Sequence, residues 1–306
     1  MNFNEKPPER LENQLGNAEA MLGGKVAGEL ERDQMLGMSL PEIKSKYPEK
    51  YAQYLYALKD EAAILHFPDM NIEKNENPKI SLLSAGARGY GFKIETQNGS
   101  HVIKPLEALK EKDISKIAGE LGIGPKQFAT QEGYIHEEFI EGTLILKLED
   151  EKCIPAYMES LGQKFAKALK KLHENNILVN DQILTDDFGK SHMIIDREGE
   201  VRFIDFGASI DISNFPEISD EEVMSLMRTD PMMAFRMHGF SEKSQAEKEN
   251  EIKGYRENIL SQFDTKEEII KWKDEQLLYE GLSFLRNRLA NVGSFYEGIQ
   301  KEMAVE

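Results

Sequence analysis

The fold of this chain is decided by residues 176–209, NILVNDQILTDDFGKSHMIIDREGEVRFIDFGAS. Two short apolar runs of β-forming residues, 193–195 and 201–204, lie on either side of the turn-forming segment Arg197-Glu198-Gly199-Glu200. Apolar runs of this length around a glycine-containing turn predict a β-hairpin. The second run leads directly into Asp205-Phe206-Gly207, so we expect an acidic residue at the end of an apolar strand.

Length and composition indicate a globular protein of one large or two modest domains. The chain has 306 residues, of which 40% are hydrophobic, enough for a packed core. No segment approaches the ~20 consecutive apolar residues of a membrane span. The first residues, MNFNEKPPERLENQ, have neither a basic start nor an apolar run, which argues against a signal peptide. The single cysteine, Cys153, excludes an internal disulfide and a cysteine-based zinc site, so we expect a cytoplasmic, reducing setting.

The net charge of −17 excludes some classes of partner. A general nucleic-acid binder needs a basic face that neutralises phosphates, and docking on anionic membranes needs the same. We therefore expect no nucleic-acid partner. An acidic surface suits a cationic substrate or a basic peptide, and it also serves solubility.

Residues 1–78 are predicted to form a helical extension. The best helical pattern runs over 41–67, with Ser39 as the N-cap and a break at Pro48. The polar stretch 71–78 is predicted to be a linker. Further helix-forming segments occur at 8–22 and 25–38.

The pattern changes to strands from Ile80. Apolar runs at 80–83, 92–96 and 101–104 are separated by a glycine-rich turn at 84–91 and by Asn98-Gly99. Asn-Gly between two such runs is a strong hairpin signal. The later segments are expected to be a helix at 106–121, a strand pair at 127–129 and 134–139, a bend at 141–142, and helices at 154–173, 219–229, 231–238, 243–263 and 266–291.

Several short motifs follow one another in this part of the chain. The turn carries Gly86, Gly89 and Gly91, and glycines without Cβ let backbone N–H groups approach phosphate oxygens, although a merely flexible turn would look the same. Val102-Ile103-Lys104 ends the third run, and acidic residues occupy the next helix. GELGIGPKQFATQEGYIHEEFIEGTLI (119–145) precedes the long helix, and Asp205-Phe206-Gly207 follows the hairpin.

Taken in order, these motifs resemble the compact branch of the protein-kinase-like superfamily. That branch holds choline kinases, aminoglycoside phosphotransferases and small atypical Ser/Thr protein kinases. The resemblance covers about 80–210 and implies an α+β, two-lobed fold, with an antiparallel-sheet N-lobe at 79–140 and a helical C-lobe at 141–306. It also implies ATP and Mg²⁺, or Mn²⁺, as cofactors.

The resemblance assigns the nucleotide-binding residues. Lys104 would pair with the α- and β-phosphates of ATP, held by Glu111, which we prefer to Glu107 one turn earlier. The 119–145 segment is similar to the family pattern of helix, Gly-x-Gly-Pro, strand and hinge, so the backbone of Glu138, Phe139 and Ile140 would meet the adenine. The phosphates would lie against Gly86, Gly89 and Gly91.

Asp205 would hold the Mg²⁺ ion, and its alternative role is simply that of an acidic residue ending a hairpin. The attacking hydroxyl would be oriented by a carboxylate in a D-x-x-x-x-N frame, which Asp187 and His192 occupy here. Asp181 competes with Asp187 for this role, because it lies the expected distance after the helix that ends at His173. Asp186 is a further reserve.

His192 stands where the family has an asparagine that contacts a second metal. Because imidazole prefers softer metals than Mg²⁺, this departure favours Mn²⁺, one-metal catalysis or a degenerate enzyme, unless His192 is only structural. The expected activity is transfer of the ATP γ-phosphate to a hydroxyl, with Ser/Thr of a protein slightly preferred. A small-molecule kinase of choline or aminoglycoside type and a pseudokinase acting as a binding module remain alternatives.

Overall fold

The computed structural model describes residues 35–49, 78–86, 89–106, 109–131, 134–179, 192–230, 240 and 243–304. The chain divides into two compact units, Met1–Pro105 and Leu106–Glu306, which are described separately below. The lobe boundaries that the resemblance implies, 79–140 and 141–306, stay a prediction.

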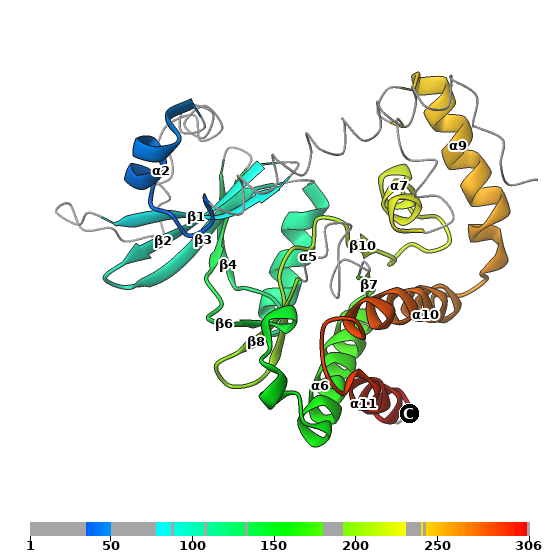
Figure 1. Cartoon of the computed structure of the whole chain (residues 1–306). Helices are drawn as coiled ribbons and strands as arrows, with labels where there is room; N and C mark the ends of the chain where they lie inside the picture. The colour runs from blue at the N-terminus through cyan, green and yellow to red at the C-terminus, as the bar shows by residue number, and fades with distance from the viewer. Residues whose placement is uncertain are drawn as a thin grey trace, which may run out of the picture. The chain divides into compact units, whose positions relative to one another are not determined.

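The described part of the first unit is a three-stranded antiparallel meander with one short helix on it (Figure 1). Its strands are β1 (Lys79–Gly86), β2 (Gly89–Thr96) and β3 (Gly99–Pro105). All three expected runs are therefore strands, and the Asn98-Gly99 hairpin is confirmed by the pairing of Thr96 with Gly99. The strands extend well into the expected glycine-rich turn, because Gly86 pairs with Gly89.

Helix α2 (Leu40–Lys46) begins at the predicted cap. The Ser39 N–H and hydroxyl both donate to the Glu42 carboxylate at 2.7 Å, which satisfies donors at the start of the helix. Leu40 and Ile43 are buried, and the helix ends before Pro48, where the break is expected. The rest of the predicted 41–67 helix and the segments 8–22 and 25–34 lie outside the described residues.

The second unit begins with helix α5 (Leu109–Glu120) and the antiparallel hairpin of β4 (Gln127–Gln131) and β5 (Tyr134–Glu138). After β5 the chain enters β6 (Gly142–Leu144), where only a bend is expected. β6 pairs with β8 (Met193–Asp196), which pairs with β9 (Val201–Phe203) in a three-stranded antiparallel sheet. The hairpin that the sequence predicts is therefore present, with β6 added beside it.

Helix α6 (Pro155–Glu174) lies beside the C-terminal helix α11 (Val292–Met303), as Figure 1 shows. Their backbones come close at two glycines. A Cβ on Gly162 would lie 1.9 Å from the Phe295 carbonyl oxygen, and one on Gly298 would lie 2.0 Å from the Glu159 carbonyl oxygen. Only glycine fits at positions 162 and 298, and the two helices therefore pack closely against each other along one face of α6.

Two core clusters hold the second unit together. The first surrounds α6, with Phe165, Phe203 and Phe295 in ring contact, and includes the second half of α10 (Lys266–Leu285). The second joins the first half of α10 to α7 (Asp220–Thr229) and α9 (Gln245–Asn258). Helix α10 therefore contributes side chains to both clusters.

The mixed α+β class with antiparallel sheets is confirmed. The predicted helix over 266–291 is too long, since α10 ends at Leu285 and a separate helix, α11, follows. The predicted helix at 231–238 lies outside the described residues. Among the helices that the structure describes, none is long and apolar enough to cross a membrane.

Candidate functional site

The candidate site is built on the β8–β9 hairpin of the second unit. Met193 pairs with Phe203 and Ile195 with Val201, and all four side chains are buried in or beside the first core cluster. One further main-chain hydrogen bond, 2.8 Å from the Ile204 N–H to the His192 carbonyl, extends the ladder beyond the two strands. Ile204, the residue before Asp205, is therefore hydrogen-bonded to His192, the residue before β8.

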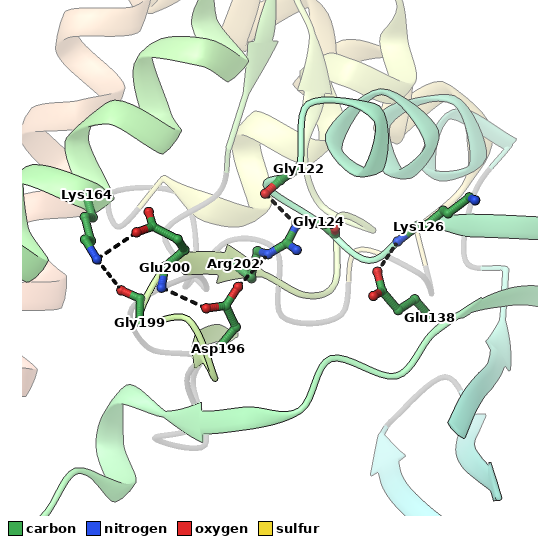
Figure 2. A network of polar contacts seen from close by, with 9 residues as sticks. All are labelled: Gly122, Gly124, Lys126, Glu138, Lys164, Asp196, Gly199, Glu200 and Arg202. Carbon is green, nitrogen blue, oxygen red and sulfur yellow. Dashed lines mark hydrogen bonds and ion pairs between the residues drawn. The ribbon is translucent and has the colours of Figure 1, made fainter. Parts of the chain in front are cut away.

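A polar network fixes the hairpin to the loop after α5 (Figure 2). Arg202 Nε donates to Asp196 Oδ2 at 3.0 Å, and its Nη1 donates to the Gly122 carbonyl at 2.5 Å. The Phe203 N–H donates to the Ile123 carbonyl at 2.7 Å. At the turn, the Glu200 N–H donates to Asp196 Oδ1 at 2.8 Å. Because charge-assisted bonds are short and directional, Arg202 and Asp196 together hold the strand that leads to Asp205.

Phe206 anchors the segment after the hairpin. Its side chain is 1% exposed and lies in the first core cluster against the loop at Gly124. A Cβ at Gly124 would come within 2.9 Å of Phe206 Cε2 and 3.0 Å of Ala118 Cβ, so the ring fits only beside a glycine. The Gly-x-Gly-Pro segment and the Asp-Phe-Gly segment, about 80 residues apart, therefore meet in this unit.

Asp205 is partly exposed, whereas the next residue, Phe206, is buried. Its backbone has φ 75°, a left-handed conformation that few residues other than glycine, asparagine and aspartate adopt readily. The Gly207 N–H donates to Asp205 Oδ1 at 3.1 Å, which stabilises the turn. The side chain is 40% exposed. The chain thus buries Phe206 and leaves an oxygen of the preceding carboxylate accessible to solvent.

His192 is the other expected metal ligand, and it lies next to Asp205. Its Nδ1 is 4.0 Å from Asp205 Oδ2, and its side chain is 18% exposed. Bonds of 2.0–2.1 Å at right angles place adjacent ligands of Mg²⁺ about 3 Å apart, so the two atoms would need to approach each other to share one ion as adjacent ligands. In the part of the chain that the structure describes, no three His, Cys, Asp or Glu side chains form a metal-binding group.

One carboxylate and one imidazole can nevertheless supply the protein ligands of a metal ion that also binds nucleotide phosphates. Mg²⁺ in such sites is held by one or two protein carboxylates together with substrate phosphates and waters. Asp205 supplies the carboxylate, and imidazole suits Mn²⁺ better than Mg²⁺. The donor set at Asp205 and His192 therefore fits a divalent cation that arrives with its own phosphate ligands.

The residues before and after segment 180–191 are attached to the chain on either side of Asp205. At one end, β7 (Ile177–Leu178) pairs with β10 (Ile210–Asp211), which follows the Asp-Phe-Gly segment. At the other end, His192 is bonded to Ile204. Asp181, Asp186 and Asp187 are within this segment and lie outside the described residues. The structure therefore fixes the two ends of the segment that carries all three candidates for the catalytic carboxylate.

The expected hinge begins at Glu138, the last residue of β5, in the same unit. The Glu138 N–H donates to the Lys126 carbonyl at 2.8 Å, and the Lys126 N–H donates to a Glu138 carboxylate oxygen at 3.1 Å (Figure 2). Phe139 is half-buried and Ile140 is 8% exposed. These residues connect β5 to β6, which pairs with β8, so the expected hinge is continuous with the hairpin sheet.

The remaining expected residues lie at strand ends and on α5. Lys104 is half-buried near the end of β3 in the first unit, where Gly86, Gly89 and Gly91 belong to the paired ends of β1 and β2. Glu111 is in the first turn of α5 and is fully buried, although it is a carboxylate. Burial of a carboxylate is costly unless it is paired, so Glu111 has a structural or functional role rather than being surface charge. Glu107 lies outside the described residues.

Sequence reasoning gave no role to Arg202, Asp196 or Asn176. Asn176 has φ 58°, its carbonyl accepts from the Ile212 N–H at 2.8 Å, and its side chain accepts from Lys266 Nζ at 2.8 Å. An asparagine directly after a helix is a usual sign of a left-handed residue, and this signal could have located the start of β7. For Arg202, a basic residue between two buried strand positions was the available signal.

Comparison of the sequence with protein-family models finds no matching model, and a search of curated proteins finds no match.

Proposed function

We propose that this protein is an ATP- and divalent-metal-dependent phosphotransferase that moves the γ-phosphate of ATP to a hydroxyl. The observation that carries the proposal is the conformation at Asp205. A left-handed aspartate with an accessible carboxylate follows a buried hairpin, and the next residue, Phe206, is buried. Left-handed backbone at a residue with a side chain is uncommon and is often found at functional sites, which supports a binding role for this carboxylate.

Phosphoryl transfer needs little covalent chemistry from a protein. It needs positioned phosphates, neutralised charge and a carboxylate that orients the attacking hydroxyl. A divalent ion, when bound, neutralises charge that develops on the phosphoryl oxygens. Asp205 would hold it with His192, while Lys104 and the glycines of β1 and β2 would position the nucleotide.

The carboxylate that orients the hydroxyl is proposed to lie in segment 180–191, because the residues before and after that segment are attached to the chain on either side of Asp205. Asp187 is five residues from His192 and Asp181 is two residues from Val179. An extended chain spans at most about 3.5 Å per residue, so either carboxylate can be within reach of the ends. We favour Asp187, with Asp181 as the alternative.

The experiment that tests this function is ADP formation from ATP in the presence of Mg²⁺ or Mn²⁺, with three kinds of acceptor. These are a basic peptide containing Ser and Thr, choline, and an aminoglycoside. Acceptor-dependent ADP formation by the wild type, lost in the Asp205→Asn variant, is the expected result. The acceptor that stimulates turnover then separates a protein kinase, which we favour, from a small-molecule kinase.

A pseudokinase that binds nucleotide without turnover is the second candidate. It is favoured by His192 in place of asparagine, since imidazole prefers softer metals than Mg²⁺, and by the 4.0 Å separation of His192 and Asp205, which is longer than the distance between adjacent ligands of one ion. Nucleotide binding that requires Asp205, without ADP formation in any of the three assays, would favour this second candidate.

A further inference from the structure

A groove lies in the second unit between α5 and β4, apart from the Asp205 site. It has a volume of about 430 Å³, within the range of ligand-binding pockets. Helix α5 contributes Lys112, Lys116 and Glu120 to one wall. The other wall comes from the β4 segment and includes Lys126, Phe128 and Thr130.

The groove is basic in a strongly acidic protein. Three lysines face it against one glutamate, a net charge of +2, whereas the whole chain carries −17. Lys112 and Lys116 are four residues apart on α5, which places them on the same helix face about 6 Å apart along the axis. Lys126 approaches from the opposite wall. A local reversal of charge of this kind attracts a partner of opposite charge.

The ammonium groups of these three lysines are not engaged by carboxylates. In the described part of the chain, none of the three lies within 4.0 Å of a carboxylate oxygen, whereas Lys164 pairs with Glu200 at 2.8 Å and Lys301 with Glu159 at 2.7 Å. The Lys126 side chain extends away from Glu138, whose carboxylate binds only the Lys126 backbone N–H (Figure 2). The groove lysines are therefore available to a ligand.

One wall of the groove also offers an aromatic surface. Lys126 Nζ lies 5.7 Å from the centroid of the Phe128 ring, and the ring is packed on the buried His136 with 4.9 Å between the centroids. His136 thus holds Phe128 in place. An occupant that uses the whole groove would bring both negative charge and an apolar side chain.

We infer that this groove binds an acidic, extended peptide segment of a partner protein. Its carboxylates would meet Lys112 and Lys116 on one wall and Lys126 on the other, and an apolar side chain would pack on Phe128. The aromatic ring of Phe128 beside the lysines favours a peptide that carries an apolar side chain among its carboxylates over a small free anion, which would leave the ring uncovered. A short acidic segment can stay within the basic groove, whereas a long polyanion such as RNA would extend beyond it and be repelled by the rest of this acidic chain. The inference does not depend on the proposed phosphotransferase activity.

The test is fluorescence anisotropy of a fluorescein-labelled peptide, EELEELEE, titrated with the full chain in the absence of nucleotide. The Lys112→Glu/Lys116→Glu double variant reverses the charge of one wall. The control is Lys167→Glu/Lys171→Glu, an exposed pair with the same spacing on α6, in which Lys167 also lies 3.8 Å from a Glu302 carboxylate oxygen. All four positions are exposed, so both variants should fold, which circular dichroism checks.

The expected result is wild-type binding that weakens at least about tenfold in the groove variant and less than about twofold in the control. Binding should also weaken with added salt, and the peptide QQLQQLQQ should bind at least about tenfold less tightly. Equal binding by the groove variant, equal binding of QQLQQLQQ, or no binding of EELEELEE to the wild type would overturn the inference. Binding of a uridine decamer that is lost in the groove variant, without peptide binding, would overturn it in favour of a nucleic acid.

Discussion

A main-chain hydrogen bond of 2.8 Å joins the Ile204 N–H to the His192 carbonyl. It ties the residue directly before Asp205 to the residue directly after segment 180–191. The pairing of β7 with β10 makes a similar attachment at the start of that segment. The residues on either side of the segment are thereby attached to the chain before and after Asp205, and this relationship underlies the proposed site.

The contact between Phe206 and Gly124 makes a direct prediction about stability. In a Gly124→Ala variant the new Cβ would lie 2.9 Å from Phe206 Cε2 and 3.0 Å from Ala118 Cβ, closer than side chains normally approach. Overpacking of a core costs about 1–3 kcal/mol, and urea denaturation should show a loss of this size. Since Phe206 follows Asp205, the affinity for metal-bound nucleotide should fall as well.

Gly254 provides the matched control for this substitution. It lies inside α9, and a Cβ built there meets no atom within 4 Å. Gly254→Ala should therefore stabilise the protein by about 0.4–1 kcal/mol, because alanine favours a helix and restricts the unfolded chain. A Gly124→Ala variant as stable as the Gly254→Ala variant would contradict the packing described for Phe206.

If His192 contacts the metal ion, the protein should prefer Mn²⁺ to Mg²⁺. His192→Asn replaces an imidazole with an oxygen donor that suits hard cations, so the ratio of Mg²⁺-supported to Mn²⁺-supported ADP formation should rise. His192→Ala removes the imidazole without adding an amide oxygen, so this variant should not raise the ratio of Mg²⁺-supported to Mn²⁺-supported ADP formation. The same ratio in wild type and His192→Asn would show that residue 192 does not contact the metal.

His173 and Asp274 predict an unusual dependence of stability on pH. His173 Nε2 lies 3.4 Å from Asp274 Oδ1, between α6 and α10. Burial lowers the pKa of His173 from 6.5 to about 4 and raises the pKa of Asp274 from 3.8 to about 7. Between pH 4 and 6.5 the folded state therefore holds a proton on Asp274, and the unfolded state holds one on His173. Both states bind one proton, so the pair leaves the stability independent of pH in this range.

Single substitutions should reveal the opposite contributions of His173 and Asp274 to the dependence of stability on pH. In Asp274→Asn the unfolded state alone takes up a proton at His173 as the pH falls from 6.5 to 4, so stability should fall by up to about 1.4 kcal/mol per pH unit relative to wild type. In His173→Gln the folded state alone protonates, at Asp274, so relative stability should rise as the pH falls from 7. Urea denaturation at a series of pH values measures both slopes. Parallel profiles for all three proteins would contradict the buried neutral pair.

The predicted partnership of Lys104 with Glu111 can be tested by a double-mutant cycle on ATP affinity. If Glu111 holds Lys104, then Lys104→Gln and Glu111→Gln should each weaken binding, and the double variant should be little weaker than either. The coupling energy should be about 1–3 kcal/mol. The same cycle with Glu107→Gln tests the alternative partner. Additive losses in the first cycle and coupling in the second would assign the role to Glu107.

Local signals in the sequence predicted most of the described elements. Asn98-Gly99, the apolar runs of β8 and β9, and apolar residues three and four positions apart in α6, such as Met158, Leu161 and Phe165, each determine structure within a few residues. Helix α11 was missed because nothing local marks the stop at Leu285, and its place beside α6 depends on Gly162 and Gly298, which are far apart in the sequence. β6 was missed for a related reason, since its three residues form a strand only through pairing with β8.

The position of Asp205 at the end of a hairpin could be predicted from the sequence, but the contacts that support this residue could not. The hairpin and the motif at its end are adjacent in sequence, so Asp205 could be located directly. The support for this residue is not adjacent, because Arg202 reaches the Gly122 carbonyl and Phe206 requires Gly124. Such contacts join segments about 80 residues apart and leave no spacing pattern that a single sequence can reveal.

The central claim is that Asp205 holds a divalent ion with a bound nucleotide, and thermal unfolding with Mg²⁺·ATP and Mn²⁺·ATP tests it most directly. The variant is Asp205→Asn, because asparagine tolerates left-handed backbone, and the control is Glu198→Gln at the exposed hairpin turn. Ligand at ~100 times its dissociation constant should stabilise the wild type and the control by about 2.7 kcal/mol, a shift of several degrees. Asp205→Asn should unfold at the same temperature with or without metal and nucleotide. An equal shift in Asp205→Asn, or no shift in the wild type with either metal, would contradict the claim.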